Sequence, residues 1–284
     1  MSRIFDALQR ANLEGDGFEF PLTSSFTPQV AQAVEEELSG VDTNSLEDCQ
    51  SLPISVSSES RLVCLSDQAS LAAEKFRFLA VRLCQLQQTR SLKKVLVTST
   101  IPEEGKSMVS ANLALSLAQR RHQKVLLVDG DLRRPSLSTR LGLPELSGLS
   151  GWLGVDRSPL ANIYRLEEAG LWFLPAGAVL ENPLESMQSG RLSVLMAQLT
   201  NWFDWVLIDS PPVLPLADAS VWSRLADGVL LVAREGTSRK RELQRGLRAL
   251  EPSHLLGVVL NSCSAGDQSN YYQRYRPALH SDQE

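Results

Sequence analysis

The fold of this chain is decided by one stretch, which reads Lys94-Val95-Leu96-Val97-Thr98-Ser99-Thr100-Ile101-Pro102-Glu103-Glu104-Gly105-Lys106-Ser107. Its first residues are an apolar run that predicts a buried strand. A turn-rich loop follows and ends in Gly-Lys-Ser, and an amphipathic run from Met108 to Arg120 then predicts a helix. A strand, a loop and a helix in this order let backbone N–H groups surround an anion at the positive end of the helix dipole. The stretch therefore predicts a phosphate-binding loop.

The side chains of this loop have separate expected roles. Lys106 is expected to reach the β- and γ-phosphates of ATP, and the Ser107 hydroxyl to bind Mg²⁺. The usual pattern begins with glycine where this chain has Thr100. Asn261 ends the last predicted strand, where it can hydrogen-bond adenine. The residues expected to line the nucleotide site are Thr100, Pro102, Glu103, Glu104, Gly105, Lys106, Ser107, Met108 and Asn261.

Two acidic motifs follow two further apolar runs. They read Asp129-Gly130-Asp131-Leu132-Arg133 and Asp209-Ser210-Pro211-Pro212. A carboxylate at the end of a strand beside a phosphate loop can hold Mg²⁺ or one of its waters, which fits Asp209. Phosphoryl transfer also needs a base for the acceptor, so one of Asp129 and Asp131 can be that base while the other faces the metal. Arg133 is expected either to contact phosphate or to pair with a neighbouring carboxylate.

Strand and helix patterns alternate along most of the chain. Strands are predicted at 94–99, 124–129, 171–174, 205–209, 228–233 and 256–261, and helices at 69–88, 107–120, 135–141, 149–154, 184–200, 217–225 and 238–250. Apolar strands separated by helices make a mostly parallel sheet covered on both faces, so the fold class is α/β. Ligands of such sheets bind at the carboxyl ends of the strands, where the three motifs lie.

The chain divides into four predicted regions. Residues 1–13 form a short amphipathic helix, and 14–60 are a flexible, acidic linker rich in Ser and Thr. Residues 61–263 form the phosphate-loop domain. Residues 264–284 are a polar tail that contains Tyr271, Tyr272 and Tyr275.

Composition narrows the class of protein. Hydrophobic residues make up 43% and charged residues 21%, as in ordinary globular proteins. No apolar stretch reaches the ~20 residues of a membrane helix, and no secretory signal is evident. We therefore expect a cytoplasmic protein that meets the inner face of the plasma membrane only through a partner. Its four cysteines are far apart and predict neither a disulfide framework nor a zinc site.

The charge is unevenly distributed. Residues 1–60 hold two basic and eleven acidic residues, a charge of −9, which leaves +4 for the rest of a chain whose total is −5. A domain this weakly basic does not predict nucleic-acid binding.

With these motifs, the chain resembles the bacterial tyrosine kinases of the P-loop NTPase type, the cytoplasmic autokinases of capsule and exopolysaccharide export. Residues 98–107 resemble the family's Walker A motif, 129–133 its Asp-x-Asp-x-Arg Walker A′ motif and 207–212 its Walker B motif. The match extends from about residue 69 to 262. The first residues, Ser2 to Leu8, also resemble the start of proteins from these export systems, but this similarity is weaker.

The resemblance implies roles and partners. Lys106 binds the phosphates of ATP, Asp129 is the base for the attacking tyrosine, and Asp131 and Asp209 lie near Mg²⁺. A transmembrane adaptor of the polysaccharide co-polymerase type activates the kinase, and a cognate tyrosine phosphatase opposes it. Members phosphorylate a C-terminal tyrosine cluster in trans within a ring-shaped homo-oligomer. Tyr271, Tyr272 and Tyr275 match the position of that cluster.

The sequence also departs from the family. Glu103 replaces the glycine that often follows the loop proline, and the ring motif Glu-x-x-Arg-x-x-Arg matches at Glu74 and Arg77 but has Ala80 in its third position. The nearest alternative is a MinD/ParA-like switch ATPase. Such proteins carry an extra lysine where this chain has Ile101, and they lack a tyrosine cluster. A third possibility is a nucleotide-binding regulatory subunit of a polysaccharide export complex.

Overall fold

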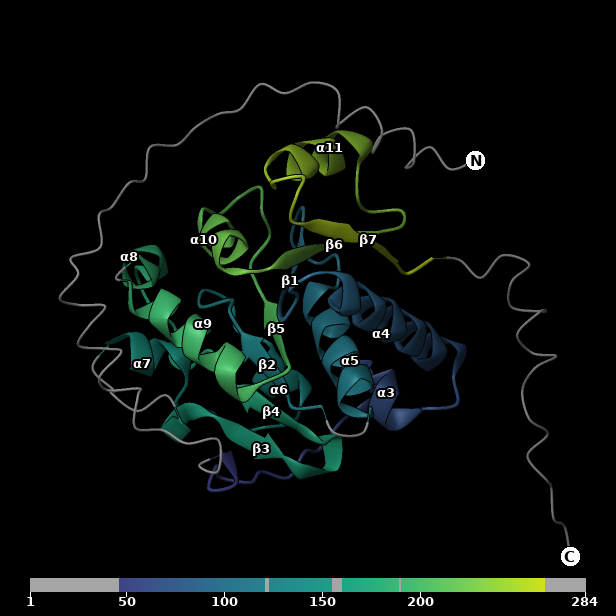
Figure 1. The fold of residues 1–284 in the computed structure, drawn as a ribbon. Coiled ribbons are helices and arrows are strands. Elements are labelled where there is room, and N and C mark those ends of the chain that lie inside the picture. Colours follow the sequence, from purple (N-terminus) through teal and green to yellow (C-terminus); the bar gives the residue numbers. More distant parts are fainter. Residues whose placement is uncertain (1–45, 121–122, 155–159, 189, 264–284) are drawn as a thin grey trace, which may run out of the picture.

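The computed structural model describes residues 46–120, 123–154, 160–188 and 190–263. A seven-stranded sheet lies at its centre, in the order β3-β4-β2-β5-β1-β6-β7 (Figure 1). All neighbouring strands are parallel except β3 and β4. The expected α/β sheet is thereby confirmed. The strands are β1 Lys94–Ser99, β2 Val125–Asp129, β3 Tyr164–Leu166, β4 Leu171–Leu174, β5 Trp205–Asp209, β6 Gly228–Arg234 and β7 Leu255–Asn261.

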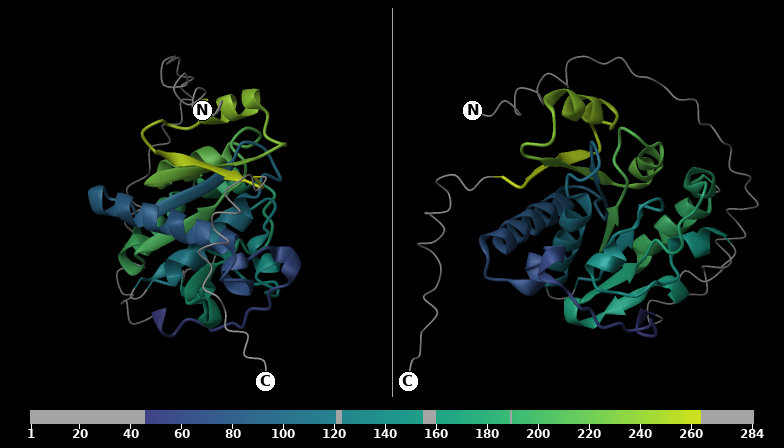
Figure 2. Two further views of the ribbon diagram at one scale, coloured as in Figure 1. Left: turned by 90° about the vertical axis from the view of Figure 1, so that its right-hand side faces the viewer. Right: turned by 180° about the vertical axis from the view of Figure 1, so that it is seen from behind.

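Helices cover both faces of the sheet, as Figures 1 and 2 show. One face is covered by α3 Val63–Ser66, α4 Leu71–Thr89, α5 Lys106–Ala118 and α6 Leu137–Arg140, and the other by α7 Leu149–Gly154, α8 Pro183–Met187, α9 Arg191–Trp202, α10 Asp218–Leu225 and α11 Lys240–Arg248. Side chains along a strand point alternately to the two faces. In β1, Leu96 joins the core beneath α7–α11, whereas Val95 and Val97 join the core beneath α3–α6. No helix among the described residues is both long and apolar enough to cross a membrane.

Two elements differ from the expectation. The predicted helix at 184–200 is two helices, α8 and α9, and Gly190 immediately before α9 has φ +81°. That left-handed conformation cannot continue a helix, and glycine adopts it without a steric penalty. The antiparallel strand β3 was not predicted, because three residues are too short to show a periodic pattern.

The end of the predicted linker is also different, because residues 46–60 pack on the body. Leu46 and Cys49 are buried in the core beneath α7–α11. Gln50 and Leu52 exchange backbone hydrogen bonds of 2.9 Å with Arg165 of β3. The expectation of a flexible linker is therefore wrong for this part. Its apolar side chains are buried in the core, and its backbone hydrogen-bonds the open edge of β3. We call residues 46–62 the strap. Residues 1–45, with the predicted helix at 1–13, and the tail at 264–284 lie outside the described residues.

Candidate active site

The three motifs meet at the carboxyl edge of the sheet. Strands β2, β5 and β1 are adjacent and parallel. Asp129 pairs in register with Asp209, and Asp209 pairs with Val97, just before the phosphate loop. Neighbouring strands are about 4.8 Å apart, so Asp209 lies one strand away from the start of the loop and Asp129 lies one strand further. The sheet order thus gathers into one site Lys106, Asp129 and Asp209, which lie 23 to 103 positions apart in the sequence.

The phosphate loop is closed by its own glutamate. Glu104 is fully buried, and its carboxylate accepts hydrogen bonds from the backbone N–H groups of Thr100 (2.7 Å) and Ile101 (3.0 Å) and from the Thr100 hydroxyl (2.9 Å). The Ser238 hydroxyl donates to the same carboxylate. The Glu104 side chain therefore faces the loop interior, and only its backbone is left to contact a nucleotide. Threonine suits position 100 because its hydroxyl takes part in this closure.

The end of the loop forms the start of α5. Gly105 has φ +94° and caps the helix, so that the first N–H groups of α5 point into the loop. Lys106 and Ser107 are the first two helical residues, and Ser107 is buried. Met108 is half-buried, whereas Pro102 and Glu103 are exposed on the outside of the loop.

Lys106 rests on the acidic residues. Its Nζ donates to Asp131 Oδ2 at 2.9 Å and lies 3.9 Å from Asp209 Oδ2. Burial by itself lowers the pKa of Lys106, but the negative charges of Asp209 and Asp131 outweigh it and raise that pKa above its ordinary value. Lys106 is therefore charged at neutral pH, and its ammonium group offsets the negative charge of Asp131 and Asp209.

Asp129 is held on one side and open on the other. Its Oδ2 accepts the backbone N–H groups of Ser136 (3.1 Å) and Leu137 (3.0 Å) at the start of α6. Its Oδ1 is buried and has no hydrogen-bond partner among the described residues. Burial, reinforced by the charge of Asp209, raises the pKa of Asp129 to about 7. A carboxylate with such a pKa and a free oxygen is suited to accept a proton.

Asp209 has the same one-sided arrangement. Its Oδ1 accepts the Ser110 hydroxyl of α5 at 3.2 Å, while its Oδ2 is buried without a hydrogen-bond partner in the described part of the chain. Burial raises the pKa of Asp209, although Lys106 lowers it. Two buried carboxylate oxygens without donors, at Asp129 and Asp209, are a costly arrangement unless a cation or a donor occupies the site.

These residues fit Mg²⁺ bound together with a nucleotide. Within the described ranges, no cluster of three or more His, Cys, Asp or Glu side chains forms a complete metal cage. Mg²⁺ commonly takes only one or two protein ligands and completes its shell with phosphate oxygens and waters. Ser107, Asp131 and Asp209 can supply such ligands or orient the waters.

Known proteins are similar to this chain in sequence and in fold, although no protein-family model matches the chain. Tyrosine-protein kinase YwqD of Bacillus subtilis is 32% identical over 212 residues, which cover 74% of this chain and 89% of that protein. The chain belongs to the bacterial tyrosine kinases. The kinase domain of Escherichia coli tyrosine kinase ETK superposes with a TM-score of 0.66 at 29% identity and covers 72% of this chain and 82% of its own.

Two further matches carry names other than tyrosine kinase. The succinoglycan biosynthesis transport protein ExoP of Rhizobium meliloti is 32% identical over 208 residues, or 71% of this kinase and 26% of ExoP. The septum site-determining protein MinD of Pyrococcus horikoshii, solved with Mg-ADP, has a TM-score of 0.50 at 26% identity over 62% of this kinase and 73% of MinD. The kinase therefore shares its nucleotide-binding fold with the switch ATPases but is more similar to tyrosine kinases.

Two expected site residues contact protein groups in the kinase. Arg133 donates to the Asp218 carboxylate of α10 through Nε at 2.6 Å and Nη2 at 3.2 Å. Of the two roles expected for Arg133, the structure therefore shows the pairing with a carboxylate. Asn261 Nδ2 donates to the Glu104 carbonyl at 3.0 Å and packs on Gly105. Asp218 was not predicted, because it is 85 residues from Arg133 and nothing in the local pattern distinguishes it from a helix-capping aspartate.

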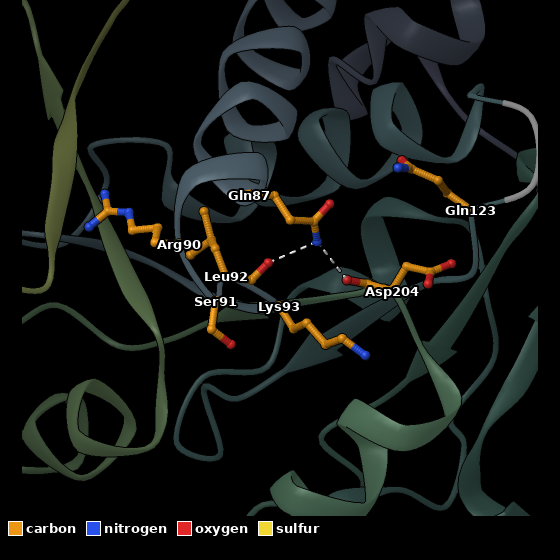
Figure 3. A pocket seen from close by; sticks show the side chains of 7 residues that line it. All are labelled: Gln87, Arg90, Ser91, Leu92, Lys93, Gln123 and Asp204. Atoms are coloured by element: carbon orange, nitrogen blue, oxygen red, sulfur yellow. Dashed lines mark hydrogen bonds between the residues drawn. The ribbon is translucent and has the colours of Figure 1, made fainter.

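A cavity of about 460 Å³ lies at the opposite, amino edge of the sheet (Figure 3). It is lined by Gln87, Arg90, Ser91, Leu92, Lys93, Gln123 and Asp204. The Gln87 amide bridges the carbonyls of Leu92 (2.8 Å) and Asp204 (3.2 Å), as Figure 3 shows. These residues precede β1, β2 and β5, so the cavity is separate from the phosphate loop.

Proposed function

We propose that this kinase transfers the γ-phosphoryl group of ATP to Tyr271, Tyr272 and Tyr275 in the tail of a second copy of the chain. The observation that carries the proposal is the meeting of Lys106, Asp129 and Asp209 at one edge of the sheet in a member of the bacterial tyrosine kinases. The phosphate loop supplies backbone donors, and the carboxylates supply the acceptor and metal functions.

The residues act in a defined order in this proposal. The N–H groups of the loop and of the first turn of α5 bind the phosphates, and Lys106 moves from Asp131 to the phosphate oxygens. Ser107, Asp131 and Asp209 would hold Mg²⁺, which would supply positive charge to offset that of the phosphates. The tyrosine oxygen forms a bond to the γ-phosphorus as the bond to the β-phosphate oxygen breaks and ADP leaves. Asp129 Oδ1 accepts the phenol proton.

The test is phosphotyrosine formation by the purified chain with Mg-ATP, followed by intact mass and peptide mapping. The chain has four tyrosines, so the three tail residues allow at most three phosphates per chain. Lys106→Met should abolish incorporation, and Phe at the three tail positions should do the same. Tyr164→Phe is the matched control, because Tyr164 is buried and its hydroxyl contacts Ser147.

Transfer in trans has its own test. The Lys106→Met chain keeps its tail but lacks the lysine, whereas the chain with three tail Phe residues keeps the site but lacks the acceptors. Phosphate should appear on the Lys106→Met chain only when the two are mixed. No phosphate in the mixture, with phosphate in the parent, would show that transfer occurs within one chain.

The switch ATPase is the competing function, favoured by the similarity to MinD. It predicts ATP hydrolysis without phosphotyrosine, even when the cytoplasmic segment of the adaptor is added. A regulatory subunit would bind ATP but would form neither phosphotyrosine nor ADP.

The proposal extends to the cellular setting. A transmembrane adaptor of the polysaccharide co-polymerase type recruits the kinase to the inner face of the plasma membrane, and a cognate phosphatase removes the phosphates. The role in polysaccharide export is supported by the similarity to ExoP. On α4, Glu74 and Arg77 pair with each other, with Arg77 Nε 2.8 Å from Glu74 Oε2, and Ala80 is buried. Only two positions of the partial ring motif are therefore available to a second copy.

A further inference from the structure

We infer that Asp218 and Trp222 of α10 are positioning residues, which hold the Asp129–Arg133 segment in register with the phosphate loop. The inference rests on the proposed function for the roles of Asp129 and Asp131. Neither α10 residue belongs to the three motifs, and neither touches the phosphate loop in the contacts described above.

Trp222 holds the glycine between the two aspartates. It is fully buried, and its indole Nε1 donates to the Gly130 carbonyl at 3.0 Å. On the other side, the Gly130 N–H donates to the Asp209 carbonyl at 2.8 Å. A Cβ at position 130 would lie 2.8 Å from the Trp222 ring and 2.7 Å from that carbonyl, so only glycine fits. Gly130 is thus pinned between α10 and β5, and the flanking Asp129 and Asp131 are fixed with it.

Asp218 holds the other end of the segment. Its carboxylate receives two hydrogen bonds from Arg133, at 2.6 and 3.2 Å, and the Asp218 side chain is only 3% exposed. A two-pronged pair of this kind fixes direction as well as distance. Next to Arg133, the Arg134 N–H donates to Asp131 Oδ1 at 3.1 Å. The side chain of Asp131 is therefore set by a backbone that Asp218 anchors.

The two contacts come from one face of one helix. Asp218 and Trp222 are four residues apart, so they lie one above the other on α10. Asp218 also lies in the first turn, where the helix dipole favours its negative charge. Helix α10 therefore contacts the segment at Gly130 and at Arg133, on either side of Asp131. A displacement of about 1 Å at a reacting group can lower the rate on the order of a hundredfold. The two α10 contacts therefore affect the rate of phosphoryl transfer by fixing the position of the aspartates, without touching the substrate.

The first experiment compares Trp222→Phe with Trp205→Phe. Both tryptophans are fully buried, but the Trp205 indole nitrogen has no hydrogen-bond partner among the described residues. Trp222→Phe removes the donor to Gly130 and part of the ring volume, whereas Trp205→Phe removes the same volume without a hydrogen bond. Trp222→Phe should lower kcat for autophosphorylation about tenfold and raise KM for Mg-ATP only severalfold. Trp205→Phe should change neither. Equal kcat in the parent and in Trp222→Phe, with only a lower melting temperature, would overturn the inference.

The second experiment tests the Arg133–Asp218 pair by a double-mutant cycle. If Arg133 acts through its position, Asp218→Asn, Arg133→Gln and the double variant should lose similar activity, because each breaks the same contact. Additive losses, or higher activity in Asp218→Asn, would show that Arg133 works on the phosphates instead.

A binding measurement separates this inference from the proposed function. ADP affinity is measured by calorimetry with and without Mg²⁺. Trp222→Phe and Asp218→Asn should weaken binding severalfold in Mg²⁺ and leave metal-free binding unchanged, since the phosphate loop is intact. This result would support the inference even if the parent made no phosphotyrosine, which would refute only the kinase proposal. Unchanged affinity in Mg²⁺ would refute the inference by itself.

Discussion

At the scale of single residues, Glu103 carries backbone strain in the phosphate loop. It has φ +66°, in the left-handed region where a side chain costs roughly 1–2 kcal/mol relative to the ordinary helix. This explains why the family often has glycine there. We predict that Glu103→Gly raises the free energy of unfolding by up to about 1 kcal/mol, because part of the relief is offset by the greater freedom of glycine in the unfolded chain. Urea denaturation measures the change.

Glu103→Gln separates conformation from charge at the same position. It keeps the strained backbone but removes the negative charge, so it should leave stability unchanged. Both variants should bind ATP roughly twofold to fivefold more tightly at low salt, as expected for one surface charge near an anionic ligand. If Gln stabilises the protein as much as Gly does, the strain argument is wrong.

Asp129 makes stability depend on pH. Its pKa is about 7 in the folded chain, against 3.8 for an unperturbed aspartate, so the folded state binds the extra proton. This contribution to stability is complete below pH 4 and is lost as the pH rises through 7. In the absence of metal and nucleotide, Asp129→Asn should remove that loss and be the more stable chain at pH 8, by a few kcal/mol at most. Denaturation curves between pH 4 and 8 that stay parallel for both chains would contradict this assignment.

At the scale of elements, α6 is held at both ends. Its N-terminus binds Asp129, and beyond its C-terminus Gly142, with φ +69°, packs directly on the carbonyl oxygen of Ser55 in the strap. We predict that Gly142→Ala costs about 2–4 kcal/mol, because a methyl group would displace the strap. Gly236→Ala is the control, since Gly236 has φ +77° but an added Cβ would meet no atom within 4 Å. Gly236→Ala should cost only about 1 kcal/mol of stability. Equal losses in the two variants would show that the strap moves aside without an energetic cost.

At the scale of the whole molecule, the strap joins the two cores on opposite faces of the sheet. Leu46 belongs to the core beneath α7–α11 and Leu62 to the core beneath α3–α6. Burying each leucine contributes about 1.5–3 kcal/mol. A chain that starts at Val63 should therefore be less stable than one that starts at Leu46 by at least about 3 kcal/mol. Thermal unfolding followed by circular dichroism tests this. Equal melting of both truncations would mean that the strap is dispensable.

The amino-acid sequence alone determined the parts of the protein that depend on local pattern. The apolar run before Thr98, the Gly-Lys-Ser ending and the aspartates at strand ends predict the sheet, the phosphate loop and the acidic residues beside it, because strand periodicity and loop chemistry act over a few neighbouring residues. Lys106, Asp129 and Asp209 could be named for this reason.

Tertiary structure alone decided which distant residues touch. The inward turn of Glu104, the pairing of Arg133 with Asp218 and the grip of Trp222 on Gly130 depend on how helices pack on the sheet. The packing of residues 46–60 likewise depends on an edge strand more than 100 residues away. Such contacts follow from strand order and from the filling of a close-packed interior, which no local pattern encodes.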